Sequence, residues 1–405
     1  DLEAARDLTP EILTAVAPAR RIVSWHGPAD SAARLAARAR QMRSTEARLH
    51  KLVPSATTAL EAVAPLVALQ ALGSDDVMMF ASGEAGAWTR LLAPRLGARV
   101  VYASTGGRPG APGQLSLRRL VEDYGLPELP PIERLFGVIG APVAESLSPR
   151  LHNGLYRQLG IESLYLAFHV EAFGEFWLEL VEGGVFAALG LPLSGLSVTT
   201  PHKEIAQAVA GASSPIATRI GAANTLVWRR GVWEAEASDP EGVTLPLVER
   251  AMSLSSRRAA VFGVGGAGRA AAVGLELGGA AVSLVHRTRG RGLHEATRLG
   301  MPFVSRQEFD PAEFDLLVNA TPLGRLPGGE MPFDVEALRE GTVVVDLVYR
   351  HDEPTALVDA ATRRGLTVID GREVLLCQAG RQFHMMTGCD FPLDEAKRLL
   401  ALGPA

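Results

Sequence analysis

The sequence lacks several features that would indicate particular classes of protein. Only two cysteines occur among the 405 residues, Cys377 and Cys389, so a disulfide framework is excluded and a reducing compartment fits best. No apolar run reaches the ~18 residues needed to cross a bilayer, so we expect no membrane partner. The net charge of −5 provides no basic stripe, which excludes nucleic acid as an expected partner. We also expect no metal site.

The remaining composition is that of an ordinary globular protein. Hydrophobic residues make up 47% and charged residues 21% of the chain, and the length suits two or three domains. The first residue is Asp1 rather than methionine, so a leader segment cannot be judged. We expect a cytoplasmic protein, with a plastid location left open, and the sequence does not indicate an oligomeric state.

The first 120 residues alternate between short apolar runs and amphipathic segments. The predicted strands are 21–25, 49–53, 77–80 and 100–103, and the main predicted helices are 31–43 and 56–72. Such alternation favours parallel strand–helix–strand units. The segment 125–132 is rich in proline and lacks periodicity, so we interpret it as a linker.

A second α/β region begins at residue 135. We expect Ser148 to cap a helix with Pro149 in its first turn, and leucines 151, 155 and 159 to form its buried stripe before Gly160 ends it. A third strand–helix region covers 258–370, and 372–402 is predicted to be mostly helical.

A glycine-rich loop lies within the third region. A buried strand at 259–262 is followed by Gly263-Val-Gly-Gly-Ala-Gly268 and a helical run over 269–277. The spacing of Gly263, Gly265 and Gly268 matches the dinucleotide-binding pattern, in which glycines allow a tight turn, backbone approach to a pyrophosphate and close helix packing. The predicted cofactor-binding residues of this loop are Gly263, Gly265, Gly266, Ala267 and Gly268.

The next predicted strand, 281–285, ends in basic residues. NAD-specific sites place a carboxylate at this strand end to bind the ribose 2′-hydroxyl, whereas an arginine there accepts a 2′-phosphate. No acid occurs at this point, so the sequence favours NADP as the cofactor. The residues predicted to contact it are His286, Arg287, Thr288 and Arg291.

The region 135–402 resembles the shikimate dehydrogenase family along its whole length, because several motifs occur in the family's order. They include Phe136-Gly-Val-Ile-Gly-Ala-Pro142, Ser146-Leu-Ser-Pro-Arg-Leu-His-Asn153, Gly195-Leu-Ser-Val-Thr-Thr-Pro-His-Lys203, Gly221-Ala-Ala-Asn-Thr225, Asn319-Ala-Thr-Pro-Leu-Gly324 and Val345-Asp-Leu-Val-Tyr349. The resemblance implies that Lys203 and Asp239 form the catalytic pair. It also implies that the substrate contacts Ser146, Ser148, Thr199, Asn224, Tyr349 and Gln378.

This region departs from the family's pattern at three places. The family usually has asparagine where Ser197 lies, Asn-Thr-Asp where Ala237-Ser-Asp239 lies, and asparagine where His286 lies. The first change affects contacts to the ring hydroxyls, and the last affects adenosine stacking. None of them removes a proton carrier.

The first 120 residues resemble the second half of type I 3-dehydroquinate dehydratase, a (β/α)8 barrel. Ile22-Val-Ser-Trp-His26 looks like the strand of its catalytic histidine, and Leu49-His-Lys51 like the strand of its Schiff-base lysine. Arg90 and Gln114 match residues that grip the carboxylate and hydroxyls of 3-dehydroquinate, although Gly110 replaces a usual serine. The resemblance implies that about the last five barrel strands are present, with the strand at Asp1 as the fourth, so we expect an inactive dehydratase in this form.

The predicted fold is therefore α/β, a partial (β/α)8 barrel followed by a two-domain shikimate dehydrogenase with a Rossmann NADP-binding domain. The expected divisions are 1–128 for the barrel part, 134–238 for substrate binding, 239–371 for NADP and 372–405 for C-terminal helices. The expected reaction is NADPH-dependent reduction of 3-dehydroshikimate to shikimate in aromatic amino acid biosynthesis. Two alternatives remain: a quinate/shikimate dehydrogenase, and a catalytically silent regulatory homologue.

Overall fold

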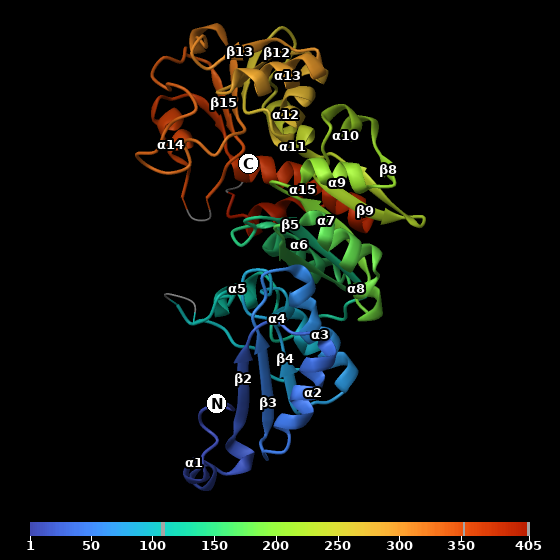
Figure 1. Cartoon of the computed structure of the whole chain (residues 1–405). Coiled ribbons are helices and arrows are strands. Elements are labelled where there is room, and N and C mark those ends of the chain that lie inside the picture. Colours follow the sequence, from blue (N-terminus) through green and yellow to red (C-terminus); the bar gives the residue numbers. More distant parts are fainter. Residues whose placement is uncertain (107–109, 351–352, 403–405) are drawn as a thin grey trace. The chain divides into compact units, whose positions relative to one another are not determined.

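The structure is a computed structural model that describes residues 1–106, 110–350 and 353–402 (Figure 1). The chain folds as two compact units, Asp1–His202 and Lys203–Ala405. No helix within the described residues is long and apolar enough to cross a membrane, and no cluster of metal-ligating side chains occurs among them.

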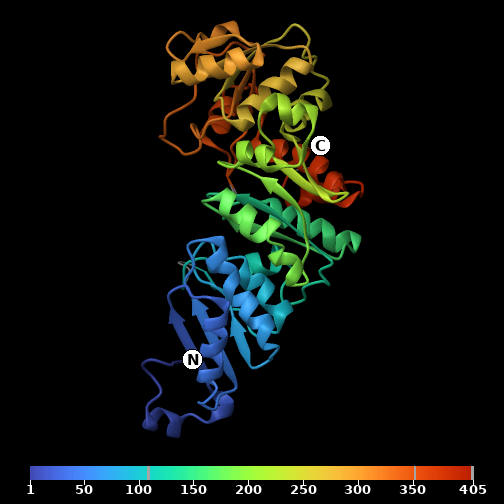
Figure 2. The same cartoon turned by 45° about the vertical axis from the view of Figure 1, so that its right-hand side comes forward.

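The first unit begins with a four-stranded parallel sheet in the order β1-β2-β3-β4. Its strands are β1 (Leu2–Glu3), β2 (Ile22–Gly27), β3 (Leu49–Pro54) and β4 (Val77–Met79). Helices α2 (Ala32–Met42) and α3 (Ala59–Leu72) pack side by side along it, as both views show (Figures 1 and 2). Helix α3 starts at a capping box of Thr58 and Glu61 and ends at Gly73, whose φ of 55° suits a glycine.

The prediction of a strand at 100–103 was wrong. These residues are not in a strand, and nearby only Ser104 forms an isolated bridge, to Ser116. The sheet therefore holds four strands among the described residues, rather than five. Residues 100–103 are only partly buried, and a strand also needs a neighbour whose backbone is free to pair.

A second parallel sheet in the first unit has the order β6-β5-β7. Its strands are β5 (Arg134–Gly140), β6 (Ser163–His169) and β7 (Leu193–Val198). Helices α6 (Ser148–Leu159), α7 (Phe173–Phe176) and α8 (Val185–Ala188) accompany it, with a π-helical segment, Trp177–Glu182, between the last two.

Helix α6 begins differently from the prediction. Leu147 is its N-cap and Ser148 is already its first helical residue, because the Ser146 hydroxyl accepts the Ser148 N–H at 3.2 Å. Leu151 and Leu155 are buried as expected, whereas Leu159 is 43% exposed. Gly160 ends the helix with a φ of 66°, as predicted.

The proline-rich segment that follows α5 (Leu117–Glu122) is anchored at its start by an ion network. Asp123 is almost fully buried and pairs with Arg119 at 2.9 Å and Arg150 at 2.7 Å. Asn153 of α6 also donates to the Asp123 carbonyl at 2.9 Å. A buried carboxylate with two arginines is strongly held, so the barrel part ends in a fixed connection rather than a free tether.

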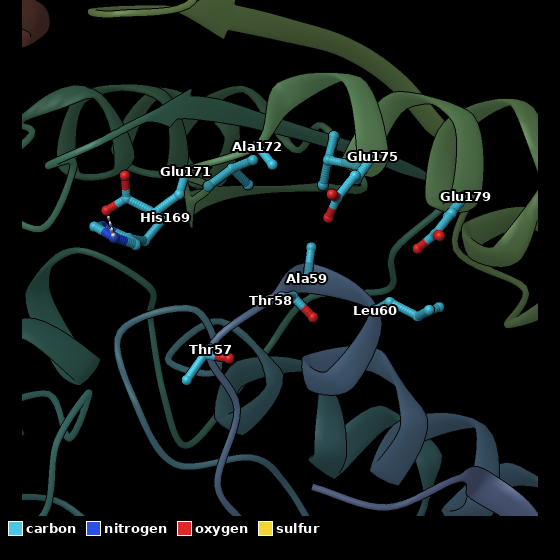
Figure 3. Close-up of a pocket in the computed structure, with 11 residues that line it drawn as sticks. Thr57, Thr58, Ala59, Leu60, His169, Glu171, Ala172, Glu175 and Glu179 are labelled. Carbon is cyan, nitrogen blue, oxygen red and sulfur yellow. Dashed lines mark hydrogen bonds and ion pairs between the residues drawn. The ribbon is translucent and has the colours of Figure 1, made fainter.

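Aromatic side chains join the barrel part to the β5–β7 sheet. The Trp88 ring lies 5.3 Å from Phe168 and 5.8 Å from Phe186, and all three side chains are buried. Nearby, a cavity of about 50 Å3 lies between the start of α3 and the segment from His169 to Glu179 (Figure 3). It has room for about one or two waters and is too small for a substrate.

The second unit opens with α9 (Lys203–Val209) and a small three-stranded group. Strand β10 (Val232–Glu236) pairs antiparallel with β9 (Thr225–Arg229) and parallel with β8 (Ala212–Ser213). Helix α10 (Pro215–Ile220) precedes β9 and ends at Gly221 with a φ of 66°.

A six-stranded parallel sheet forms the rest of the second unit, in the order β13-β12-β11-β14-β15-β16. The strands are β11 (Arg258–Phe262), β12 (Ala281–His286), β13 (Phe303–Ser305), β14 (Leu316–Asn319), β15 (Val343–Asp346) and β16 (Thr367–Ile369). The chain order is thus third, second, first, fourth, fifth, sixth, which is the doubly wound dinucleotide-binding topology. Apolar clusters cover both faces of the sheet, as buried parallel strands require.

The second unit also contains α-helices after β10. They are α11 (Asp239–Glu249), α12 (Gly266–Leu277), α13 (Arg289–Leu299), α14 (Ala356–Arg363), α15 (Gly371–Thr387) and α16 (Leu393–Leu399). Helix α12 begins inside the glycine-rich loop, three residues before the predicted start. Helix α11 packs against both α12 and α15, and Gly242 near the start of α11 lies close to Val374 and Gln378 of α15.

Candidate active sites

A buried ion pair in the second unit joins Lys203 and Asp239. Lys203 opens helix α9, and Asp239 opens helix α11 directly before Pro240. Their side chains are 14% and 11% exposed, and the Lys203 ammonium contacts the Asp239 carboxylate. The two residues are 36 positions apart in the chain, so the fold brings together the pair that the motifs predicted.

Asn224 fixes the position of the Asp239 carboxylate. Its amide nitrogen donates to Asp239 Oδ1 at 2.7 Å and to Ser238 Oγ at 2.9 Å, and its amide oxygen accepts the Ser238 N–H at 2.9 Å. Gln382 of α15 donates to the Asn224 carbonyl at 3.0 Å and to the Thr225 hydroxyl at 2.9 Å. Asn224 therefore holds the acid of the ion pair, and Gln382 holds the backbone turn that contains Asn224.

The glycine-rich loop has the geometry that the sequence pattern predicted. Gly263 has a φ of 100°, and a Cβ on Gly268 would lie 2.0 Å from the Gly263 carbonyl oxygen, so both positions require glycine. A Cβ on Gly265 would meet nothing within 4 Å, which leaves open space over the loop. Gly265 is the N-cap of α12 and no side chain caps that end, so backbone N–H groups face this space.

The end of β12 presents basic side chains to solvent. Arg287, Thr288 and Arg291 are exposed, and His286 Nδ1 accepts the Thr288 N–H at 3.0 Å. Among the described residues, neither Arg287 nor Arg291 has a recorded ion-pair partner. Their guanidinium groups are therefore free to meet an anion beside the loop.

The remaining predicted substrate residues are placed as follows. In the first unit, Ser146 and Ser148 lie at the start of α6, and Thr199 follows β7, where its N–H donates to the Ile139 carbonyl at 2.9 Å. In the second unit, Tyr349 follows β15 and Gln378 lies on α15, both partly buried. A Cβ on Gly242 would approach Gln378 Cβ at 3.2 Å, so Gln378 faces the start of α11.

The register of the first sheet groups the candidate residues of the barrel part. Glu3, Ser24 and Lys51 lie in one row across β1, β2 and β3, and His26 lies two residues beyond Ser24 on the same face. His26 Nδ1 is 2.7 Å from Glu3 Oε2, a contact that orients the imidazole ring. The histidine and lysine predicted from the motifs are thus brought to one face.

Lys51 lies in a buried, mixed environment. Its side chain is 7% exposed, its ammonium contacts Asp1, and it lies 4.7 Å from the centroid of the Tyr102 ring. Burial lowers the pKa of Lys51 from its ordinary value; Glu3 opposes this shift and Arg90 reinforces it. Burial thus favours the neutral amine relative to a free lysine, whereas the carboxylates of Asp1 and Glu3 favour the charged form.

Arg90 and Gln114 come from the segments after β4. Arg90 on α4 (Thr89–Leu92) is buried with its guanidinium 4.5 Å from the centroid of Phe80, and burial lowers its pKa to about 10. Gln114 Oε1 accepts the Gly110 N–H at 2.9 Å, so Gly110 retains a contact with Gln114.

The structure adds residues that motif reasoning did not identify. Glu3 partners His26, Tyr102 lies beside Lys51, and Gln382 holds the Asn224 turn. A weak signal existed for Gln382, which lies four residues after Gln378 and so on the same helix face. No local signal pointed to Glu3, because its pairing with His26 depends on strand register.

Two family models match separate parts of the chain. Residues 1–129 match the family described as "Type I 3-dehydroquinase", and residues 138–226 match "Shikimate dehydrogenase substrate binding domain". These matches cover the two lysine-containing regions described above.

Similar proteins support both parts. A protein named "Shikimate dehydrogenase (NADP(+))" from Rubrobacter xylanophilus is 37% identical over 277 residues, which is 66% of this chain and 95% of that protein. A chloroplastic bifunctional 3-dehydroquinate dehydratase/shikimate dehydrogenase from Arabidopsis thaliana is 28% identical over 85% of this chain, and the match covers 59% of that protein.

Solved structures agree with the dehydrogenase match. Shikimate dehydrogenase from Thermus thermophilus in complex with NADP(H) and shikimate is 32% identical with a TM-score of 0.58, covering 66% of this chain and 98% of that one. The enzyme from Aquifex aeolicus is 31% identical with a TM-score of 0.60, covering 66% and 97%. The chain therefore belongs to the shikimate dehydrogenase family, with a type I 3-dehydroquinase region before the dehydrogenase in the same polypeptide.

Proposed function

We propose that this chain reduces 3-dehydroshikimate to shikimate with NADPH in aromatic amino acid biosynthesis. The observation that carries the proposal is the buried pair of Lys203 and Asp239, held by Asn224 in the unit that contains the dinucleotide loop. The Thermus thermophilus relative that binds NADP(H) and shikimate supports the same reading.

NADP fits the residues at the edge of the six-stranded sheet in the second unit. The open space over Gly265 and the uncapped start of α12 suit a pyrophosphate, and the two unpaired arginines after β12 suit a 2′-phosphate. The residues that would hold it are Gly263, Gly265, Gly266, Ala267, Gly268, His286, Arg287, Thr288 and Arg291.

In this mechanism the chain's own residues manage charge and protons at the substrate ketone. When bound, NADPH supplies a hydride to the ketone carbon. The Lys203 ammonium stabilises the negative charge that gathers on the ketone oxygen, and the pair of Lys203 and Asp239 supplies the proton that makes it a hydroxyl. Asn224 keeps the Asp239 carboxylate beside the lysine, so the pair needs little rearrangement during the reaction.

The substrate contacts and the domain division belong to the same proposal. Ser146 and Ser148 would bind the substrate carboxylate, and Thr199, Asn224, Tyr349 and Gln378 would contact its hydroxyls. The segment 134–238 would bind substrate, 239–371 would bind NADP, and 372–405 would supply the C-terminal helices. Two free cysteines support action in a reducing compartment such as the cytoplasm or a plastid.

The test is a matrix of rates with the purified protein. Shikimate and quinate are each paired with NADP+ and NAD+, and NADPH or NADH formation is followed by absorbance. We expect the fastest reaction with shikimate and NADP+ and a much slower one with NAD+. No reaction with any of the four pairings would overturn the proposal.

Two alternatives give different outcomes in that matrix. A quinate/shikimate dehydrogenase would oxidise both substrates at similar rates. A silent regulatory homologue would oxidise neither, but it would be expected to lack Lys203 or Asp239, and both residues are present as an ion pair. The intact pair therefore favours an enzyme.

For the barrel part, we propose that these 405 residues alone do not turn over 3-dehydroquinate. Lys51 would form an imine with the substrate ketone and release water, and His26, oriented by Glu3, would move the proton of the adjacent carbon. Barrel sites, however, draw residues from several strand ends around a closed sheet, whereas β1 has a strand neighbour on one side only among the described residues. Turnover by this polypeptide alone would overturn the proposal.

A further inference from the structure

A buried arginine of helix α12 connects three separate segments of the second unit. Arg269 is 2% exposed and lies one residue after the glycine-rich loop. Its Nη1 donates to the Val264 carbonyl of that loop at 3.1 Å. Its Nε donates to the Ile220 carbonyl at 2.9 Å, and its Nη2 donates to the Gly221 carbonyl at 3.2 Å.

Two carboxylates complete the surroundings of this guanidinium. Glu204 Oε1 lies 2.8 Å from Arg269 Nη2, and Glu295 Oε2 lies 3.6 Å from Arg269 Nη1. An arginine carries five N–H donors in a rigid fork, and here three carbonyls accept from them while two carboxylates lie within ion-pair distance. Lysine has no such fork and cannot reproduce the arrangement.

Each partner of Arg269 belongs to a segment with a proposed functional residue. Glu204 directly follows Lys203 at the start of α9, and the carbonyls at 220 and 221 precede the turn that contains Asn224. The Lys203 carbonyl also accepts the Ala223 N–H at 2.8 Å, which joins the first two segments. Val264 belongs to the dinucleotide loop.

Packing supports the same connection independently of hydrogen bonds. A Cβ added at Gly266 would lie 3.1 Å from Lys203 Cβ and 3.2 Å from Ala222 Cβ. The start of α12 therefore lies directly against the catalytic lysine and the turn before Asn224. A small movement of the loop relative to α9 would change where Lys203 lies.

We propose that Arg269 is a positioning residue that fixes the dinucleotide loop, the Asn224 turn and the Lys203 helix as one body. This inference rests on the proposed dehydrogenase function and extends it. By holding the loop and the lysine at a constant separation, Arg269 aligns hydride transfer and proton transfer at the same substrate carbonyl. Its role differs from that of Lys203, because it touches neither substrate nor reacting atoms.

Arg298 of α13 provides a matched control. It donates to the Ile220 carbonyl at 2.7 Å and to the Arg219 carbonyl at 2.9 Å, and it pairs with Glu295 at 2.9 Å. It therefore shares the Ile220 carbonyl and the Glu295 carboxylate with Arg269. Among the described residues, Arg298 has no hydrogen bond or ion pair with Val264 or Glu204. Its loss should therefore leave the dinucleotide loop and helix α9 in the same relative positions.

The experiment compares Arg269→Gln, Arg269→Lys and Arg298→Gln with the unmodified chain. For Arg269→Gln we expect kcat to fall roughly 10–100-fold with little change in KM for shikimate, because misplacement by about 1 Å costs about this much. The deuterium isotope effect with shikimate labelled at the reacting carbon should rise toward its intrinsic value. Arg269→Lys should restore little of the rate, and Arg298→Gln should stay within about 2–3-fold of the starting rate.

A second readout does not depend on activity. The chain contains only three lysines, Lys51, Lys203 and Lys397, so amine labelling followed by mass spectrometry reports on each. In the ligand-free protein, Lys203 should be labelled several-fold faster relative to Lys397 in Arg269→Gln, because α9 opens more often without its anchor. The Kd for NADP+, measured by fluorescence, should change less than kcat.

The outcomes separate this inference from the proposed function. A wild-type chain inactive toward shikimate sinks the proposed function, and Lys203 labelling then still decides whether Arg269 holds α9. An active wild type with an unchanged isotope effect and unchanged Lys203 labelling in Arg269→Gln overturns the inference, even if the melting temperature falls. Should Arg269→Gln fail to fold, Glu204→Gln removes only the ion pair to α9, and the same two readouts must move in the same direction.

Discussion

The two lysine-containing regions of this chain each place a lysine beside an aspartate, but the surroundings of the two pairs differ. Lys203 lies against a carboxylate that an asparagine holds in place, which suits a lysine that works as a cation. Lys51 is more deeply buried, and burial lowers its pKa, which suits a lysine that works as a neutral nucleophile. The two roles that we propose for these lysines therefore rest on their surroundings, since the residue type is the same.

The two regions also differ in how completely the fold surrounds the lysine. Around Lys203, the loop, the Asn224 turn and helix α15 all come from one unit of the structure. Around Lys51, four parallel strands form an open sheet, whereas a closed barrel would add residues from further strand ends. We therefore expect dehydrogenase activity from the region of Lys203. In the region of Lys51 we expect a reactive amine but no dehydratase turnover.

The largest expected effect comes from removing the cation. Lys203→Ala should lower kcat for shikimate oxidation by roughly 10²–10⁴-fold with little change in KM, because the ammonium acts mainly in the transition state. Lys397→Ala, at the third lysine of the chain, is the matched control and should leave kcat near its starting value. A near-normal kcat for Lys203→Ala would show that Lys203 is an ordinary charged residue and would contradict its proposed role in catalysis.

Part of this picture could be predicted from the sequence. The glycine loop and the pair of Lys203 and Asp239 were predictable, since loop chemistry is local and each residue of the pair lies within a distinct motif. The contact of Glu3 with His26 was not, because it depends on which residues of β1 and β2 lie opposite each other.

Local signals also misled in two places. Residues 100–103 have the apolar character of a strand, but only the bridge from Ser104 to Ser116 forms there. Ser148 has the character of a helix cap, but the hydroxyl of Ser146 accepts its N–H and the helix starts one residue earlier. In both places a contact outside the local pattern decided the structure.

A second prediction tests whether the barrel part shares one core with the β5–β7 sheet of the first unit. Trp88 of the barrel part is 2% exposed against Phe168 and Phe186, so Trp88→Ala should lower the free energy of unfolding by about 3–5 kcal/mol. Trp228, 47% exposed, is the control, and its replacement should cost about 1 kcal/mol or less. Chemical denaturation followed by circular dichroism measures both; equal small losses would mean that the barrel part is only loosely attached.

The third prediction concerns the cofactor side of the dehydrogenase region. A charge-assisted contact to a 2′-phosphate contributes about 1.5–3 kcal/mol, so Arg287→Ala should weaken NADP+ binding by roughly 10–150-fold. Binding of NAD+ should barely change. Arg289→Ala, at a neighbouring exposed arginine that pairs with Glu308 at 3.9 Å, is the control. Equal losses for both cofactors would indicate a folding defect instead.

The smallest expected effect sharpens the contrast at Lys51. Because burial lowers the pKa of Lys51 below 10.5, its labelling by an amine reagent should reach half-maximum at a lower pH than a free lysine does. Because the pKa of Lys51 is lower in the folded chain, the unfolded chain holds more protons at pH values between the folded pKa and 10.5. The free energy of unfolding should therefore rise with pH across that interval. Lys51→Met should lose that pH dependence; a half-maximum at or above 10.5 would contradict the assignment.

The most direct test of the contrast between the two regions is one assay with two substrates. The 405-residue chain is given NADPH with either 3-dehydroshikimate or 3-dehydroquinate, and NADPH consumption is followed by absorbance. We predict rapid consumption with 3-dehydroshikimate and none with 3-dehydroquinate until a separate dehydratase is added. Immediate consumption with 3-dehydroquinate, or none with 3-dehydroshikimate, would contradict the account.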